Sequence, residues 1–137
     1  MSVKDLRPAL RAFLMADTGI QAIVAARVYP MVLPQGERRA SIVYNRISGE
    51  GDHTMDGATG LARPRYQIDC WAADPDSAAA LSNLVKNRID GYRGTMGVGA
   101  DQVTVQGVFL ANEGDGYDAD SKLYRDRRDY FVNFEER

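Results

Sequence analysis

Residues 61 to 73 read Leu-Ala-Arg-Pro-Arg-Tyr-Gln-Ile-Asp-Cys-Trp-Ala-Ala, and they carry the clearest structural signal in the chain. Tyr66, Ile68 and Cys70 alternate with side chains of the opposite phase, which is the pattern of a strand with one buried face. A glycine-rich segment precedes this strand, and Asp74 begins a helix directly after it. Nothing in these residues is typical of catalysis. The order predicts a loop, an amphipathic strand and a helix in direct succession.

Three helices are predicted around this strand. The first runs from residue 4 or 5 to residue 14, because its apolar residues recur on one helical face. Thr18 and Gln21 have the spacing of a capping box, which predicts that a short second helix begins there. The third helix runs from Pro75 to Asp90, with Asp74 as its N-cap and Gly91 as its C-terminal stop.

Four strands are predicted, at residues 41–48, 63–72, 101–110 and 122–134. In the third of them, Val103, Val105 and Phe109 are predicted to share one face, and in the last one Tyr130, Val132 and Phe134 do so. Residues 49–60 and 112–121 are predicted to be polar connections. The fold class is therefore α+β, a mostly antiparallel sheet of about four strands with helices packed on one face. The whole chain, residues 1–137, is predicted to be a single domain.

Composition excludes several classes of function. The formal net charge is -2, and the 17 basic residues are spread along the chain rather than gathered in the stripe that a nucleic-acid binder needs. No apolar run is long enough to span a membrane, and the charged N-terminal residues do not resemble a signal peptide. Cys70 is the single cysteine, so we expect a reduced, buried side chain in a reducing cytosol.

No catalytic or metal-binding pattern stands out. His53 is the only histidine, and no nucleophile motif accompanies it. Asp52, His53 and Asp56 are a weak alternative as metal ligands, because a zinc site needs about four nitrogen or sulfur donors. The glycines of residues 94–99 do not match a phosphate-binding loop. We therefore expect no cofactor and no metal.

Two features are candidates for interaction with other proteins. The segment from Gly49 to Gly60 is longer than the usual hairpin connection, so it is either a binding element or a mobile loop. Trp71, the only tryptophan, lies in the phase opposite to Tyr66 and Ile68. Tryptophan is enriched at protein interfaces, although this side chain can also pack under a helix or a loop.

The order of these segments resembles the tail-completion, or tail-terminator, proteins of long-tailed bacteriophages and of phage-like gene transfer particles. The resemblance covers most of the chain and is weaker after about Gly94. It is carried by the opening helix, the short helix leading into Arg27-Val-Tyr-Pro30, the Pro34-Gln-Gly36 loop, the strand at 41–48, the Asp56-Gly-Ala-Thr-Gly-Leu61 segment, and the strand Arg65-Tyr-Gln-Ile-Asp-Cys-Trp71 with its helix.

The resemblance implies a non-enzymatic virion protein. Such a subunit forms a ring, expected to be a homohexamer, that caps the tail tube, stops its polymerisation and joins the tail to the head connector. Its partners are then copies of itself, the major tail tube protein and a head-closure or connector protein, while DNA only passes through the lumen and no membrane is involved. Its place is the head–tail junction of the virion, after assembly in the cytoplasm of the bacterial host.

Residues expected at the interfaces with neighbouring subunits or with the tube follow from the long loop, from the tryptophan and from the mixed charges of the last strand. Two alternatives remain open: a head-closure or neck protein of the same particle, or a small ligand-binding or enzymatic domain. The candidate interface residues are Gly49, Asp52, His53, Met55, Asp56, Thr59, Leu61, Trp71, Arg125, Arg127 and Asp129.

Overall fold

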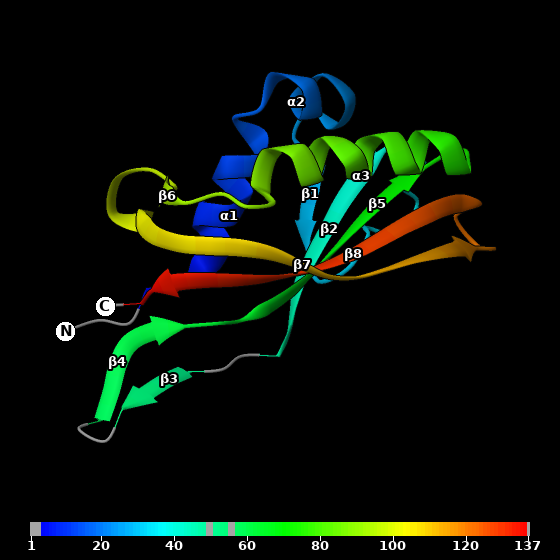
Figure 1. Cartoon of the computed structure of the whole chain (residues 1–137). Helices are drawn as coiled ribbons and strands as arrows, with labels where there is room; N and C mark the ends of the chain where they lie inside the picture. Colours follow the sequence, from blue (N-terminus) through cyan, green and yellow to red (C-terminus); the bar gives the residue numbers. More distant parts are fainter. Residues whose placement is uncertain (1–3, 49–50, 55–56, 137) are drawn as a thin grey trace.

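The sheet is the centre of the molecule, and all helices lie on one side of it (Figure 1). The computed structural model describes residues 4–48, 51–54 and 57–136, with backbone only for residues 51–54 and 57–59. Within these residues, eight strands form one curled sheet in which every pairing is antiparallel except that of β1 with β2. The predicted α+β class is confirmed, and so is the placement of the helices on one face.

The strand order places the longest strands in the middle and at one edge of the sheet. From one edge, the order is β1, β2, β5, β8, and β7 lies on the far side of β8. The short β4 pairs with the end of β8 on the same side as β5, and β3 pairs with β4. The bounds are β1 Val28–Pro30, β2 Ser41–Ser48, β3 Gly51–Thr54, β4 Gly57–Ala62, β5 Arg65–Ala72, β6 Gly94–Met96, β7 Val103–Asp118 and β8 Leu123–Glu135.

Each α-helix begins at an aspartate whose carboxylate accepts a backbone N–H of the first turn, as is usual for an N-cap. The cap of the second helix is Asp17, which accepts from Ile20 N–H at 3.1 Å. The predicted capping box at Thr18 is therefore wrong, because Thr18 is already the first helical residue. The helices are α1 Leu6–Met15, α2 Thr18–Val24 and α3 Pro75–Ile89.

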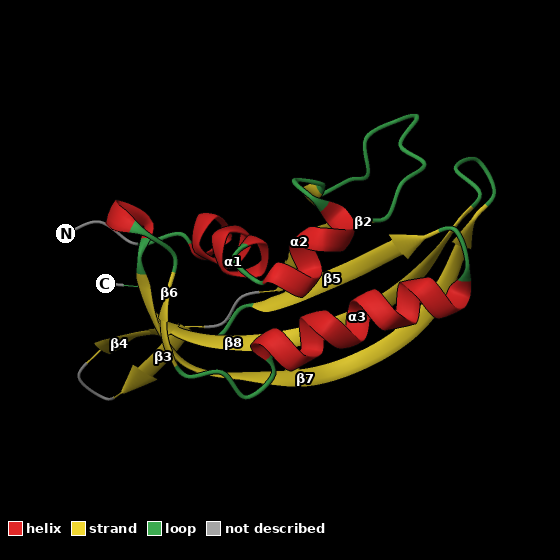
Figure 2. Cartoon of the chain, turned by 90° about the horizontal axis from the view of Figure 1, so that it is seen from above, coloured by secondary structure: helices red, strands yellow, loops and turns green. Residues whose placement is uncertain are grey.

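The core lies between the helices and the inner face of the sheet. α3 packs on β5 and β8, as the view from above shows (Figure 2). The inner residues of β8, Tyr130, Val132 and Phe134, are buried as predicted. Cys70 is fully buried, as expected, and burial raises the pKa of its thiol.

The sheet is larger than the four strands that the sequence indicates. The segment 49–60, predicted as a connection, contains β3 and most of β4. The segment 112–121 was predicted to be a link as well, yet β7 continues through it to Asp118 and pairs with β8 along the way. Both segments are rich in glycine and polar residues, which have low strand propensity. Pairing with a long neighbouring strand overrides that local preference.

The predicted phase of Phe109 is also wrong. β7 has a bulge between Val105 and Gly107, and the extra residue reverses the faces of the residues that follow, as far as a second irregularity between Leu110 and Asn112. Val103, Val105 and Val108 are consequently buried, whereas Phe109 is 54% exposed on the opposite face.

Candidate interaction surface

The face of the sheet opposite the three α-helices is the candidate site, and we call it the helix-free face. Strand alternation places every second residue of β5 and β8 there, and the register puts Trp71 beside Arg125, Asp69 beside Arg127 and Gln67 beside Asp129. Its central residues are Arg65, Gln67, Asp69, Trp71, Arg125, Arg127, Asp129 and Phe131.

Asp129 is the carboxylate that pairs with the arginines of this face, and we call it the anchor. Its side chain is 4% exposed, and Arg65 Nη2 donates a 2.9 Å hydrogen bond to its Oδ2. Arg127 Nε lies 4.0 Å from the other carboxylate oxygen, Oδ1. One buried carboxylate thus accepts a hydrogen bond from Arg65 and attracts Arg127, and the two arginines come from neighbouring strands.

Asp69 is the second buried carboxylate of the face. Gln67 Nε2 donates to both of its oxygens at 3.0 Å. Burial raises the pKa of Asp69, while the hydrogen bond from Gln67 and the positive charges of Arg125 and Arg127 act in the opposite direction. Burial dominates, so the folded chain holds this carboxylate in an environment that disfavours its charge.

Buried polar atoms without a hydrogen-bond partner concentrate on this face. Among the described residues, seven buried side-chain nitrogen or oxygen atoms have no partner, and Tyr130 Oη is the one that lies on the helix-covered side. Each such atom costs about 1–3 kcal/mol when it is left unpaired. The other six are Arg65 Nε, Trp71 Nε1, Arg125 Nε, Arg127 Nε, Asp129 Oδ1 and Asn133 Oδ1.

Two glycines of β7 allow the arginines of β8 to lie flat across it. Gly114 is paired with Arg127 and Gly116 with Arg125. A Cβ atom at Gly114 would lie 3.1 Å from Arg127 Nη2, and one at Gly116 would lie 3.0 Å from Arg125 Nε. The two glycines therefore leave room for the guanidinium groups of Arg127 and Arg125 over β7.

Trp71 lies in a hollow of about 380 Å³ at the end of the face near the β7–β8 turn. The loop from Leu33 to Arg38 forms one wall, and residues 118–121 form another. Arg38 joins the two walls, because its Nη1 donates to Asp120 O at 2.9 Å. The outward phase predicted for Trp71 is confirmed; its role at an interface remains a prediction.

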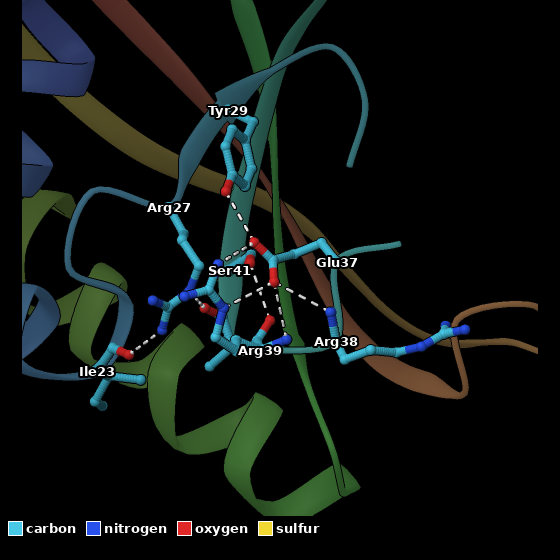
Figure 3. Close-up of polar contacts among 8 residues, drawn as sticks. Ile23, Arg27, Tyr29, Glu37, Arg38, Arg39 and Ser41 are labelled. Atoms are coloured by element: carbon cyan, nitrogen blue, oxygen red, sulfur yellow. Dashed lines mark hydrogen bonds and ion pairs between the residues drawn. The ribbon is translucent and has the colours of Figure 1, made fainter. Parts of the chain in front are cut away.

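A group of hydrogen-bonded side chains around Glu37, which we call the Glu37 corner, holds the loop from Leu33 to Arg38 in place (Figure 3). Glu37 accepts from Tyr29 Oη at 3.0 Å and from Arg39 Nε at 3.0 Å. The hydrogen bond from Arg39 is the main reason why the pKa of Glu37 falls to about 2. Arg27 donates to Ile23 O and Ala40 O, which ties the end of the loop to α2.

A second, more apolar hollow lies at the opposite end of the helix-free face. It has a volume of about 340 Å³ and is lined by Arg63, Phe109, Phe131 and Asn133. Phe109 reaches this face because of the bulge in β7, and no periodic pattern in the sequence indicates that. For the rest of the helix-free face the sequence did hold a signal. Gly114 and Gly116 alternate in β7 as Arg125 and Arg127 do in β8, and the glycines face the arginines.

The predicted interface residues fall into two groups. Trp71, Arg125, Arg127 and Asp129 come together on the helix-free face. Leu61 lies elsewhere, at the base of the β3–β4 hairpin, where it pairs with Glu135. Of the remaining residues, Asp52 and His53 lie on β3 and Thr59 on β4, whereas Gly49, Met55 and Asp56 are outside the described residues.

The described residues hold no cluster of three or more side chains that would ligate a metal ion. No helix in the described part of the chain has the length and apolar character needed to cross a membrane.

Two comparisons with known proteins give a match, one to a family model and one to a solved structure of similar fold. A model of the family described as tail completion protein gp17 matches residues 8–132. A chain from a structure of the virion of a native gene transfer agent particle has a similar fold, with a TM-score of 0.76 and 17% sequence identity. That alignment covers 95% of this chain and 94% of the other. A sequence search among curated proteins finds no match.

Proposed function

The chain belongs to the tail completion protein gp17 family, and from this premise we propose that it forms a homohexameric ring on the end of the tail tube. Members of this family are structural proteins of the virion tail and not enzymes. The ring ends polymerisation of the tube and offers its other surface to the head connector. Its partners are copies of this chain, the major tail tube protein and a head-closure or connector protein.

The observation that supports this proposal most strongly is the helix-free face. Six buried polar atoms lack hydrogen-bond partners there, and Asp129 pairs with Arg65 and lies 4.0 Å from Arg127. Such a surface is costly for an isolated subunit, and a partner of complementary charge that covers it offsets part of that cost. A protein that works by assembly has a use for it, because the partner recognises the fixed pattern of charges.

The edges of the sheet support ring formation. β6 pairs with β7 only over residues 103–105. The outer edge of β7 beyond Ala111 is therefore open to a strand of a neighbouring molecule. A closed ring needs two different contact patches on each subunit. An open edge on one side and a different edge, β1, on the other side meet that requirement.

The β3–β4 hairpin is the second proposed contact. It projects from the end of the sheet near the termini (Figure 1), and in the described part of the chain it pairs with β8 at Leu61 and Ala62. We assign to it the contact with the tube or with a neighbouring subunit. The net charge of -2 suits a lumen through which DNA passes without binding, because like charges repel the phosphates.

The first experiment measures assembly and capping together. Light scattering across a range of protein concentrations should give the mass of six subunits, or an exchange between monomer and ring. Purified tail tubes should bind the protein at one end, as seen by electron microscopy with a labelled chain. A protein that stays monomeric and does not bind tube ends would contradict the proposal, and binding to head connectors alone would favour the head-closure alternative.

The second experiment tests the hairpin. Replacing Gly51–Thr59 with a short glycine linker should leave the melting temperature nearly unchanged, because β4 contacts the rest of the sheet only at its end. The variant should fail to cap tubes, giving overlong tails or unjoined heads. Normal infectious particles would refute this role. The substitution Val98→Ser, at an exposed residue outside both the hairpin and the helix-free face, serves as the control.

A further inference from the structure

The turn after edge strand β1 displays two large apolar side chains, Met31 and Val32, which we call the apolar knob. They are 66% and 68% exposed, and they belong to the uncharged run Pro30-Met-Val-Leu-Pro34. Met31 has a φ of 71°, which is unfavourable for a residue that carries a Cβ atom. The fold nevertheless retains this conformation, with Met31 N–H bonded to Tyr44 O at 2.9 Å. The knob is therefore a fixed feature of the surface.

The aromatic hollow formed by Arg63, Phe109, Phe131 and Asn133 is a fixed feature as well. Its volume is about 340 Å³, and Phe109 contributes a ring that is 54% exposed. A Cβ atom at Gly107 would lie 2.8 Å from that ring, so the ring rests on the glycine backbone. The guanidinium of Arg65 lies over the Phe131 ring, 5.5 Å from its centre. The hollow is thus formed before any partner arrives.

The knob and the hollow lie at opposite edges of the sheet. The knob follows β1 and the hollow includes β7, with β2, β5 and β8 between these strands. At about 4.8 Å for each of the four spacings, the two edges are roughly 19 Å apart. A chain cannot insert its knob into its own hollow. A neighbouring copy can do so.

We infer that the apolar knob of one subunit inserts into the aromatic hollow of the next subunit and that this contact closes the ring. The inference rests on the proposed ring and names the residues that join its subunits. Two different patches at opposite edges give a head-to-tail contact, which is the kind that generates rings. Insertion brings the methionine sulfur against aromatic rings, a favourable contact, and removes two exposed apolar side chains from water.

Cross-linking tests the pairing directly. Variants Met31→Cys and Phe109→Cys are made singly in the full chain, and a short bismaleimide is added with tail tubes present. Native Cys70 does not interfere, because it is fully buried. Each variant alone should give no covalent dimer, whereas a mixture of the two should give dimers that contain one chain of each. A chain carrying both substitutions should give a ladder of products up to the closed ring.

Variants without cross-linker supply the second readout. Met31→Gly removes half of the knob and relieves the unfavourable φ, so its melting temperature should not fall below that of the wild type. The protein concentration at which half of the Met31→Gly chains are assembled should nevertheless rise at least about tenfold. Phe109→Ser should have the same effect. Val98→Ser, which removes a side chain that is 71% exposed and belongs to neither patch, should leave assembly unchanged.

The outcomes separate this inference from the proposed function. A ring that forms without cross-linking between positions 31 and 109 overturns the inference and leaves the ring intact. Phe109→Ser that keeps the ring but no longer binds tube ends also overturns it, and assigns the hollow to the tube. A chain that remains monomeric at tube ends and in solution overturns both.

Discussion

The two faces of one sheet differ in what their residues do. On the helix-covered face, Ile68 and Tyr130 are 1% and 0% exposed among other apolar side chains. On the helix-free face, Asp69 and Asp129 are 6% and 3% exposed although no α-helix covers them. Neighbouring residues of the same strands therefore provide the stability of the subunit on one side and a fixed, incompletely paired polar surface on the other. The comparison teaches that burial alone does not identify a core.

The largest expected effect tests the helix-covered face. Ile68→Ala removes a side chain that is 1% exposed between β5 and the helices. The free energy of unfolding should fall by about 2–5 kcal/mol, because a cavity remains where the side chain was. Chemical denaturation of the isolated subunit measures this. A loss below about 1 kcal/mol would show that this face is not the core of the fold.

Asp129→Asn tests the anchor of the helix-free face. It leaves Arg65 and Arg127 without a carboxylate, and Arg65 is only 29% exposed. The free energy of unfolding should fall by about 1–3 kcal/mol, less than for a fully buried pair because water reaches one partner. A double-mutant cycle with Arg65→Gln should show coupling of the two side chains. Additive effects would contradict the proposed anchor.

Asp69→Asn should change stability in the opposite direction. Because the pKa of Asp69 is raised in the folded chain, its stabilising contribution is present below the unfolded pKa of about 3.8 and is lost as the pH rises through the folded pKa. The variant should therefore be slightly more stable than the wild type at pH 7, with the difference vanishing below pH 3.8. Denaturation at several pH values measures it, and a less stable variant at pH 7 would contradict the assignment.

Glu37→Gln gives the matching test at the corner beside the Trp71 hollow. The pKa of Glu37 falls from 4.5 to about 2, so its contribution is present above pH 4.5 and is lost as the pH falls toward 2. Wild type and variant should differ above pH 4.5 and converge near pH 2. The effect should be small, because Arg39, the main partner of Glu37, is 68% exposed and water screens the pair. A difference that grows toward acid pH would refute it.

The smallest effect on stability is expected for Gly114→Ala. The new Cβ atom would lie 3.1 Å from Arg127 Nη2, the mobile end of a side chain, so the free energy of unfolding should change by less than about 0.5 kcal/mol. Displacing Arg127 should still weaken capping of tail tubes. Unchanged capping would show that the position of Arg127 over Gly114 has no role in capping.

The sequence predicted those parts of the fold that follow from local pattern. The alternation around Ile68 and the helix capped by Asp74 are both present, because each pattern agrees with the tertiary structure. Phe109 was placed on the wrong face because a bulge has no periodic signature. The strand from Asn112 to Asp118 was missed because its pairing with β8, and not its own residues, makes it a strand.

The candidate site was predictable only in part. Trp71, Arg125, Arg127 and Asp129 were selected from phase and charge, and the register brings them together. Arg65 was missed because its role depends on a contact with Asp129 across two strands. Contacts of that kind follow from the register of the sheet, which the sequence of one strand does not specify.

The length of tail tubes tests the central claim most directly. Tubes are polymerised with the wild-type chain or with the variant Arg125→Ala/Arg127→Ala, whose melting temperature is checked first, and their lengths are measured by electron microscopy. The wild type should give tubes of one length, and the folded variant should give overlong tubes, because it lacks the charges of the helix-free face. Tubes of the same length with both proteins would contradict the proposal that the helix-free face takes part in assembly of the cap.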